Sequence, residues 1–124
     1  MSIIGHGIDI EDMKRFSLLA DEDWVSRVFT LSEINIIPSG TRRLKHIASR
    51  FCAKEAAMKA FGLSLGPNAS FKDFEIYREA GCAPQITLSD RMEDKARSLG
   101  VSKIILSLSH SETSVVASVI LDVG

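Results

Sequence analysis

Residues 41–61 read TRRLKHIASRFCAKEAAMKAF, and they predict one long helix around which the rest of the fold is organised. Gly62 follows at the position where a glycine commonly caps the C-terminus of a helix. At about 100° per residue the helix carries one apolar stripe, which consists of Leu44, Ile47, Ala48, Phe51 and Met58. Such a stripe has to be buried against another element, which the flanking segments supply.

Glu55 lies in the middle of this apolar stripe, where a core residue is expected. Burying an ionised carboxylate without a partner is very costly, so Glu55 has to be protonated, paired with a base or bound to a metal ion. Lys59 follows one helical turn later and offers a simple ion pair. The spacing by itself leaves the ion pair and the metal ligand open.

The segments on either side of the long helix predict an α+β fold. Before it, the pattern predicts a strand at 3–10, helices at 11–20 and 21–29, and a short helix opened by a capping box of Thr30 and Glu33. After it, the pattern predicts strands at 71–78, 85–88, 101–109 and 114–121, and a helix at 90–99. We therefore expect a mostly antiparallel sheet packed against a long central helix, in a single domain spanning residues 1–124.

The first predicted strand has two unlike faces. One face carries Ile4, Ile8 and Ile10, and the other carries Gly5, Gly7 and Asp9. Glycine in a strand permits another backbone or a ligand to come close, so this pattern favours a strand end that faces a ligand. The alternative is a bulge followed by an aspartate that caps the next helix.

Asp9 and Glu55 together suggest a magnesium site, because Mg²⁺ commonly binds one or two carboxylates, water and the phosphates of a substrate. Basic residues crowd the same helix, which makes it a candidate phosphate-binding surface as well as an ordinary solvated face. The chain contains no G-x-x-x-x-G-K-[ST] pattern, so side chains rather than a P-loop would bind the phosphates.

His110 ends the cluster Ser-Leu-Ser-His at 107–110. A serine hydrolase is excluded, because there is no G-x-S-x-G elbow and because Ser109 and His110 point to opposite faces of a strand. His110 can donate to a phosphate or act as an acid. A structural role at the hairpin turn is equally open.

The composition excludes several classes of protein. The net charge is -1, 45% of the residues are hydrophobic, and no apolar run is long enough to cross a bilayer. Cys52 and Cys82 form no metal-binding pair or disulfide framework, which is typical of reduced thiols in the cytoplasm. We therefore expect a cytoplasmic protein that binds neither membrane nor nucleic acid, since aromatic platforms for bases are sparse.

Four stretches, in order, resemble the motifs of the holo-acyl-carrier-protein synthases, the small phosphopantetheinyl transferases of fatty-acid synthesis. They are Gly7-Ile8-Asp9-Ile10 with Lys14-Arg15-Phe16, Arg27-Val28-Phe29-Thr30 with Glu33, RFCAKEAAMKA at 50–60, and Ser107-Leu108-Ser109-His110. The resemblance implies a phosphopantetheinyl transferase fold and a magnesium-dependent activity. In that activity the 4′-phosphopantetheine group of coenzyme A moves to a serine of apo-acyl carrier protein, and 3′,5′-ADP is released.

The resemblance also implies roles for individual residues. Asp9 and Glu55 would bind magnesium, and Glu55, Lys59 and His110 would be catalytic. Coenzyme A would contact the set Asp9, Arg50, Lys59, Pro84 and His110, and the carrier protein would contact Lys14, Arg15 and Arg27. The family works as a homotrimer with active sites between protomers. Its Gly-basic-Pro turn reads Cys82-Ala83-Pro84 here, so the missing charge would have to come from another residue, such as Arg78.

In the expected reaction the carrier serine attacks the β-phosphate of coenzyme A. Glu55, directly or through a water, is the first candidate for the base, and a hydroxide on the metal is the alternative. The rival function is a non-catalytic module that binds acidic carrier domains through its basic surface. The presence of Asp9, Glu55 and Lys59 together argues against this rival.

Overall fold

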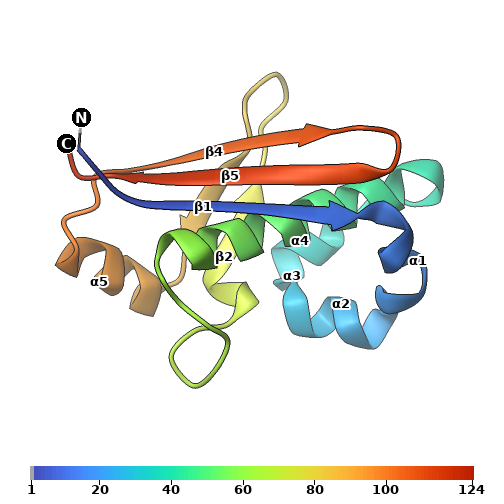
Figure 1. Ribbon diagram of the computed structural model, residues 1–124. Helices are drawn as coiled ribbons and strands as arrows, with labels where there is room; N and C mark the ends of the chain where they lie inside the picture. The colour runs from blue at the N-terminus through green and yellow to red at the C-terminus, as the bar shows by residue number, and fades with distance from the viewer. Residues whose placement is uncertain (1) are drawn as a thin grey trace.

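The computed structural model describes residues 2–124 and has the predicted α+β fold (Figure 1). Its helices are α1 Phe16–Leu19, α2 Glu22–Val28, α3 Leu31–Asn35, α4 Arg43–Ala60 and α5 Asp90–Ser98. Its strands are β1 Ile3–Asp12, β2 Phe74–Tyr77, β3 Gln85–Leu88, β4 Lys103–His110 and β5 Ser114–Asp122. Short 3₁₀ turns precede α1, α4 and β2, at Met13–Arg15, Gly40–Arg42 and Phe71–Asp73.

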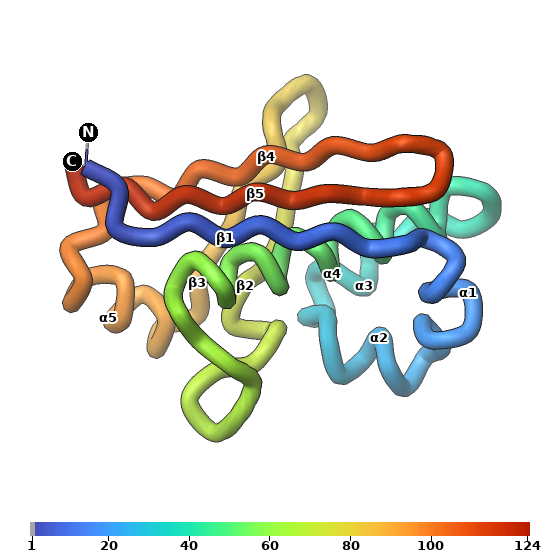
Figure 2. The backbone as a smooth tube through the Cα atoms, in the orientation of Figure 1, coloured from blue at the N-terminus to red at the C-terminus, as the bar shows by residue number. Residues whose placement is uncertain are grey.

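The strands form two antiparallel sheets rather than one. The larger sheet has the order β1-β5-β4, and β2 pairs with β3 in a separate ribbon. Helix α4 runs along one face of the larger sheet, with α1 to α3 gathered at one end of the molecule and α5 at the other (Figures 1 and 2). The prediction of antiparallel strands packed against a long central helix is confirmed.

The glycine face of β1 packs on α4. A Cβ atom added to Gly7 would overlap the carbonyl oxygen of Ala56 and lie 2.7 Å from the amide nitrogen of Ala60. A Cβ atom added to Gly5 would overlap the carbonyl oxygen of Ala60. These two glycines therefore admit the backbone of the helix, which corrects the expectation that they clear space for a ligand.

The prediction of a helix over 11–20 is wrong at its start, because β1 continues to Asp12. Glu11 and Asp12 are paired with Val115 and Ser114 of β5, and this pairing keeps both residues extended. The Asp12 side chain then caps the 3₁₀ turn by accepting a hydrogen bond of 3.1 Å from the amide of Lys14. The extension places Glu11 on the same face of β1 as Asp9.

Lys54 lies in the core, although it belongs to the basic stretch that was expected on the surface. It is fully buried, and its Nζ atom donates to Glu33 Oε1 at 2.7 Å and to the carbonyl oxygens of Phe74 and Phe71 at 2.7 and 3.0 Å. The Glu33 carboxylate also completes the predicted capping box with Thr30. This buried ion pair joins α3, α4 and β2, and it is stable only because every charge has a partner.

Within residues 2–124, no helix combines the length and the apolar character that crossing a bilayer requires.

Candidate active site

Three carboxylates meet where β1 packs on α4. Asp9 and Glu11 point to the same face of the strand because they are two residues apart, and Glu55 reaches them from the helix. Each side chain offers a ligand atom within 4.8 Å of the other two. The predicted pair of Asp9 and Glu55 is therefore brought together, with Glu11 as a third member.

Only one of the two carboxylate oxygens of Asp9 has a hydrogen-bond partner. Its side chain is 10% exposed, and Oδ1 accepts a hydrogen bond of 2.9 Å from Lys59 Nζ. Its Oδ2 atom is buried and has no hydrogen-bond partner among the described residues 2–124. A buried oxygen without a partner costs free energy, and a hard cation beside it would remove that cost.

The electrostatics of the cluster favour a cation. Burial, followed by the charges of Asp9 and Glu11, raises the pKa of the Glu55 carboxyl. Burial also raises the pKa of Glu11, and the charge of Arg15 opposes that shift. Because like charges raise each other's pKa, a divalent cation would stabilise the ionised forms, and the donor set fits Mg²⁺.

Lys59 pairs with Asp9 rather than with Glu55. Its ammonium also donates to the carbonyl oxygen of Ile8 at 3.1 Å, and its side chain is 54% exposed. The hydrogen bond to Asp9 raises the pKa of Lys59 above its ordinary value. Lys59 is thus a charged donor at the open edge of the cluster.

Glu11 was missed as a candidate because residues 11–20 read as a helix. The detectable signal was the alternation of Asp9 and Glu11, which share one face only if the strand continues.

A basic pocket of about 330 Å³ lies against the N-terminal half of α4. Its lining includes Lys45, Arg50, Arg78, Pro84 and His110 but no acidic residue, together with Ser49, Leu108 and Ser109. Lys45 Nζ lies 3.3 Å from His110 Nε2. The predicted residues Arg50, Pro84 and His110 are therefore brought together here and not in the carboxylate cluster.

Arg50 is a guanidinium without a counter-ion in this pocket. Its Nε atom is buried and lacks a hydrogen-bond partner in the described part of the chain. Burial and the nearby charge of Arg78 lower the pKa of Arg50. Arg78 is held over the pocket because its Nε atom donates to the carbonyl oxygen of Cys82 at 2.8 Å. The arrangement suits an anion with more than one charge.

The two sites share one face of the larger sheet. Glu11 pairs with Val115, and Val115 pairs with His110, so Glu11 and His110 are two strand spacings apart, which is about 10 Å. Arg50 and Glu55 lie five residues apart on α4, about 7.5 Å along the helix axis, and at about 100° per residue their side chains point about 140° apart around it.

The predicted carrier-binding residues lie around the end of β1 but are not gathered into one cluster. Arg15 Nη1 lies 2.7 Å from Glu11 Oε2, so its guanidinium contacts the carboxylate cluster. Arg27 lies on α2, where it pairs with Asp23 at 3.1 Å, and Lys14 is exposed.

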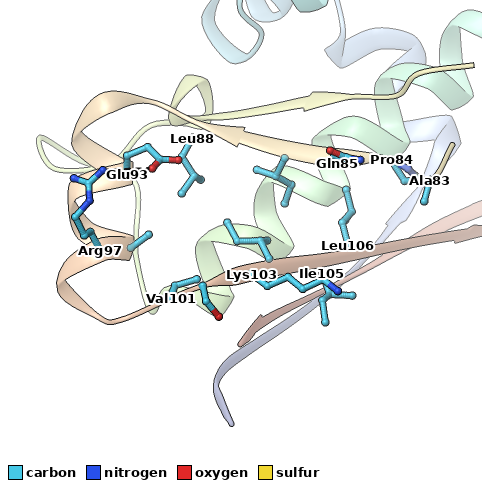
Figure 3. Close-up of a pocket in the computed structure, with 14 residues that line it drawn as sticks. Ala83, Pro84, Gln85, Leu88, Glu93, Arg97, Val101, Lys103, Ile105 and Leu106 are labelled. Atoms are coloured by element: carbon cyan, nitrogen blue, oxygen red, sulfur yellow. Dashed lines mark ion pairs between the residues drawn. The ribbon is translucent and has the colours of Figure 1, made fainter. Parts of the chain in front are cut away.

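A further cavity, of about 590 Å³, opens between β4 and the segment formed by β3 and α5 (Figure 3). Its lining is mainly aliphatic and carries the charges of Glu93, Arg97 and Lys103, of which Glu93 and Arg97 form an ion pair at 3.9 Å. Pro84 is the only predicted site residue in this lining. The cavity therefore lacks the convergent charges of the other two sites.

Comparison with known proteins gives matches along nearly the whole chain. The model of the 4′-phosphopantetheinyl transferase superfamily matches residues 5–119. The holo-[acyl-carrier-protein] synthase of Koribacter versatilis is 37% identical over 97% of this chain and 98% of its own length. The synthase of Moorella thermoacetica is 42% identical over 84% of this chain and 82% of its own.

Solved structures agree with these matches. The holo-[acyl-carrier-protein] synthase of Neisseria meningitidis superposes with a TM-score of 0.89 at 29% identity, covering 98% of this chain and 99% of that one. The synthase of Bacillus anthracis, solved in complex with CoA (3′,5′-ADP), gives a TM-score of 0.81 at 32% identity and covers 96% of both chains. The synthase of Helicobacter pylori, in complex with coenzyme A, gives 0.79 at 28% identity, with coverage of 94% and 99%.

Proposed function

Because this chain belongs to the 4′-phosphopantetheinyl transferase superfamily and is an enzyme of the holo-[acyl-carrier-protein] synthase type, we propose that it modifies an acyl carrier protein that serves fatty-acid biosynthesis. The 4′-phosphopantetheine group of coenzyme A is transferred to a serine of the apo-carrier in a magnesium-dependent reaction, and 3′,5′-ADP is released. The observation that carries the proposal is the carboxylate cluster of Asp9, Glu11 and Glu55 beside a basic pocket on one face of the sheet.

Asp9 and Glu55 are the proposed residues that hold magnesium against the pyrophosphate of coenzyme A. When bound, the ion neutralises charge on the phosphate oxygens and so makes the β-phosphorus easier to attack. The buried, unpartnered Oδ2 of Asp9 supports this assignment.

Lys59 and Glu55 are proposed to bind the phosphate of coenzyme A and to accept the proton of the carrier serine. Because the Lys59 side chain is 54% exposed, its ammonium group can leave Asp9 and donate a hydrogen bond to a phosphate oxygen. The raised pKa of Glu55 favours its role as the base that accepts the serine proton, directly or through a water. The serine oxygen bonds to the β-phosphorus as the bond to the bridging oxygen breaks, and 3′,5′-ADP takes up that electron pair.

The basic pocket is the proposed site for the phosphates of the adenosine part of coenzyme A. Arg50, Pro84 and His110 would contact the ligand there, and Arg78 would supply the charge that Ala83 lacks. In this proposal His110 donates a hydrogen bond to a phosphate of coenzyme A, because Lys45 and Arg50 rather than a carboxylate surround it.

Replacing Arg50 by glutamine is expected to raise the KM for coenzyme A about tenfold or more and to change kcat little, because a charge-assisted contact to a phosphate is lost. Steady-state kinetics with varied coenzyme A measures both constants. Arg42→Gln is the matched control, since Arg42 is an exposed arginine outside the pocket. An unchanged KM in Arg50→Gln would remove the pocket from the proposed site.

A homotrimer with active sites between protomers is also part of the proposal. The outer face of β1 presents Ile4, Ile8 and Ile10, which are 48%, 57% and 66% exposed. Contiguous exposed aliphatic side chains on a sheet commonly mark a protein contact. The single domain over residues 1–124 and the cytoplasmic location stay predictions from the sequence.

Intact-mass measurement of a carrier protein tests the proposed function. Purified protein is incubated with apo-carrier, coenzyme A and Mg²⁺, and the carrier is expected to gain the mass of one phosphopantetheinyl group. The gain should disappear when EDTA is added or when the carrier serine is replaced by alanine. A carrier that binds the protein but gains no mass would favour the rival function, a non-catalytic carrier-binding module with Lys14, Arg15 and Arg27 on its surface.

A further inference from the structure

We propose that the buried ion pair of Lys54 and Glu33 is a positioning device for the basic pocket. The pair holds the ribbon of β2 and β3, and the loop that joins these strands carries Arg78 and Pro84 to the pocket. Lys54 and Glu33 are not part of the pocket lining, so they act on a bound ligand through the ribbon rather than by contact. The inference rests on the proposed function, in which this pocket binds phosphates of coenzyme A.

The first observation is that the ion pair binds the backbone of the ribbon and of the turn before it. Lys54 Nζ donates to the carbonyl oxygens of Phe74 at 2.7 Å and Phe71 at 3.0 Å, in addition to Glu33 Oε1 at 2.7 Å. Glu33 Oε2 accepts a hydrogen bond of 3.0 Å from the amide of Ile76. Backbone groups have fixed places along a strand, so these bonds determine where β2 lies on α4.

The second observation is that the ion pair joins the two walls of the pocket. Lys54 follows Arg50 by four residues on α4, so it lies on the same face of the helix, about 6 Å further along the axis. Ile76 precedes Arg78 by two residues, which is about 6.6 Å along an extended chain. The pair is therefore one helical turn from the α4 wall and one strand repeat from the ribbon wall.

The third observation is that β4 gives the ribbon no hydrogen-bonded support. Within residues 2–124 no backbone hydrogen bond joins β3 to β4, and the cavity of about 590 Å³ opens between them (Figure 3). Pro84 lines this cavity as well as the basic pocket. Asp73, at the start of the ribbon, is bound by Arg91, which ties the ribbon to α5 and not to α4. In the described chain, Lys54 supplies the hydrogen bonds between α4 and the ribbon.

The charges of the pocket make such an anchor useful. Arg50 and Arg78 both line the pocket, and their like charges repel until an anion binds. Burial and the charge of Arg78 lower the pKa of Arg50, and the charge of Glu33 opposes that shift. Without the anchor, this repulsion favours a ribbon that stands away from α4. A phosphate would then have to bring the ribbon back, and its apparent affinity would fall.

A purely stabilising role does not require these two charges. Lys54 is fully buried and Glu33 is 4% exposed, and burial lowers the pKa of Lys54 while the charge of Glu33 opposes that shift. Replacing a buried ion pair by apolar residues of similar volume is often neutral for stability. Apolar side chains cannot bind particular carbonyl and amide groups, however, so the charged pair is suited to fixing a position.

Binding of 3′,5′-ADP to the full-length protein tests the inference, because this nucleotide carries phosphates of the kind assigned to the pocket and its binding needs no turnover. Lys54→Met is combined with Glu33→Gln, which leaves no buried charge without a partner. The Kd from isothermal titration calorimetry is expected to rise about tenfold or more, while the melting temperature changes little. In steady-state kinetics the KM for coenzyme A should rise in the same proportion. The value of kcat should change little, because the carboxylate cluster keeps its contacts.

Leu121→Ala is the control for a loss of stability alone. Leu121 is a buried residue of β5 outside the pocket, so its truncation should lower the melting temperature and leave the Kd for 3′,5′-ADP unchanged. Normal binding by the folded double variant of Lys54 and Glu33 would overturn the proposal, and so would an equal rise of the Kd in Leu121→Ala. Should the double variant be unfolded, Lys54→Gln with Glu33→Gln replaces it. The same outcomes then apply, because two N–H groups cannot serve the three acceptors of Lys54.

The same titration separates this inference from the proposed function. If Arg50→Gln also binds 3′,5′-ADP as tightly as the unaltered protein, the pocket itself is misassigned. If Arg50→Gln loses binding and the double variant of Lys54 and Glu33 does not, the pocket stands and only the positioning role fails.

Discussion

Replacing Glu55 by glutamine is expected to lower kcat/KM for phosphopantetheinyl transfer about a thousandfold or more, because both metal-dependent stabilisation and proton transfer would be affected. Glutamine has nearly the same shape, so the packing of α4 is preserved. Burial and the charges of Asp9 and Glu11 raise the pKa of Glu55, so neutralising this residue removes repulsion and should not lower the melting temperature. Initial rates from carrier mass and thermal unfolding measure the two effects.

Glu93→Gln is the matched control for this variant. Glu93 lies on α5 at the other end of the molecule, where its side chain is 55% exposed and lies 3.9 Å from Arg97. Its removal should leave transfer unchanged. Turnover by Glu55→Gln at half the normal rate or more would contradict the assignment of Glu55 to metal and base.

Replacing Gly7 by alanine is expected to lower the free energy of unfolding by roughly 3 kcal/mol or more, because backbone rather than a flexible side chain occupies the space. The added Cβ would overlap the carbonyl oxygen of Ala56 and lie 2.7 Å from the amide nitrogen of Ala60. Helix α4 would have to move away from β1, which also separates Glu55 from Asp9. Urea unfolding followed by circular dichroism measures the change in stability.

Gly66→Ala is the matched control for Gly7→Ala. Gly66 has no atom near the place of an added Cβ and no positive φ, so the free energy of unfolding should change by about 0.5 kcal/mol or less. Transfer by Gly7→Ala should fall in parallel with its stability. Equal urea midpoints for the two variants would contradict the close packing of β1 on α4.

Local sequence was enough for most of the helices and turns. The helix over 41–61 is found as α4 with a preceding 3₁₀ turn, and the capping box of Thr30 and Glu33 is present. The strands joined through 111–113 form the predicted antiparallel hairpin. These features depend on residues within one or two turns of each other, so their signals are complete in a short window.

Lys54 and Glu55 show where such local reasoning stops. They are neighbours on α4, yet Lys54 is fully buried and Glu55 is partly exposed. The apolar stripe predicted a buried Glu55 and an exposed Lys54, because in that prediction only one face of the helix is covered. In the structure the larger sheet covers one side of α4, and β2 with α3 covers another, so Lys54 needs the partner that Glu33 supplies.

The identity of Asp9, Glu55 and Lys59 as candidate site residues was readable along the chain, because each breaks a local pattern or belongs to a short motif. The membership of Glu11 and the separate pocket of Arg50, Arg78 and His110 were not. Both depend on β-sheet register, since Glu11 remains extended through its pairing with Val115 and reaches the level of His110 across β5. Glu11 and its partner Val115 are 104 positions apart, so no short window of the sequence contains both residues of the pair.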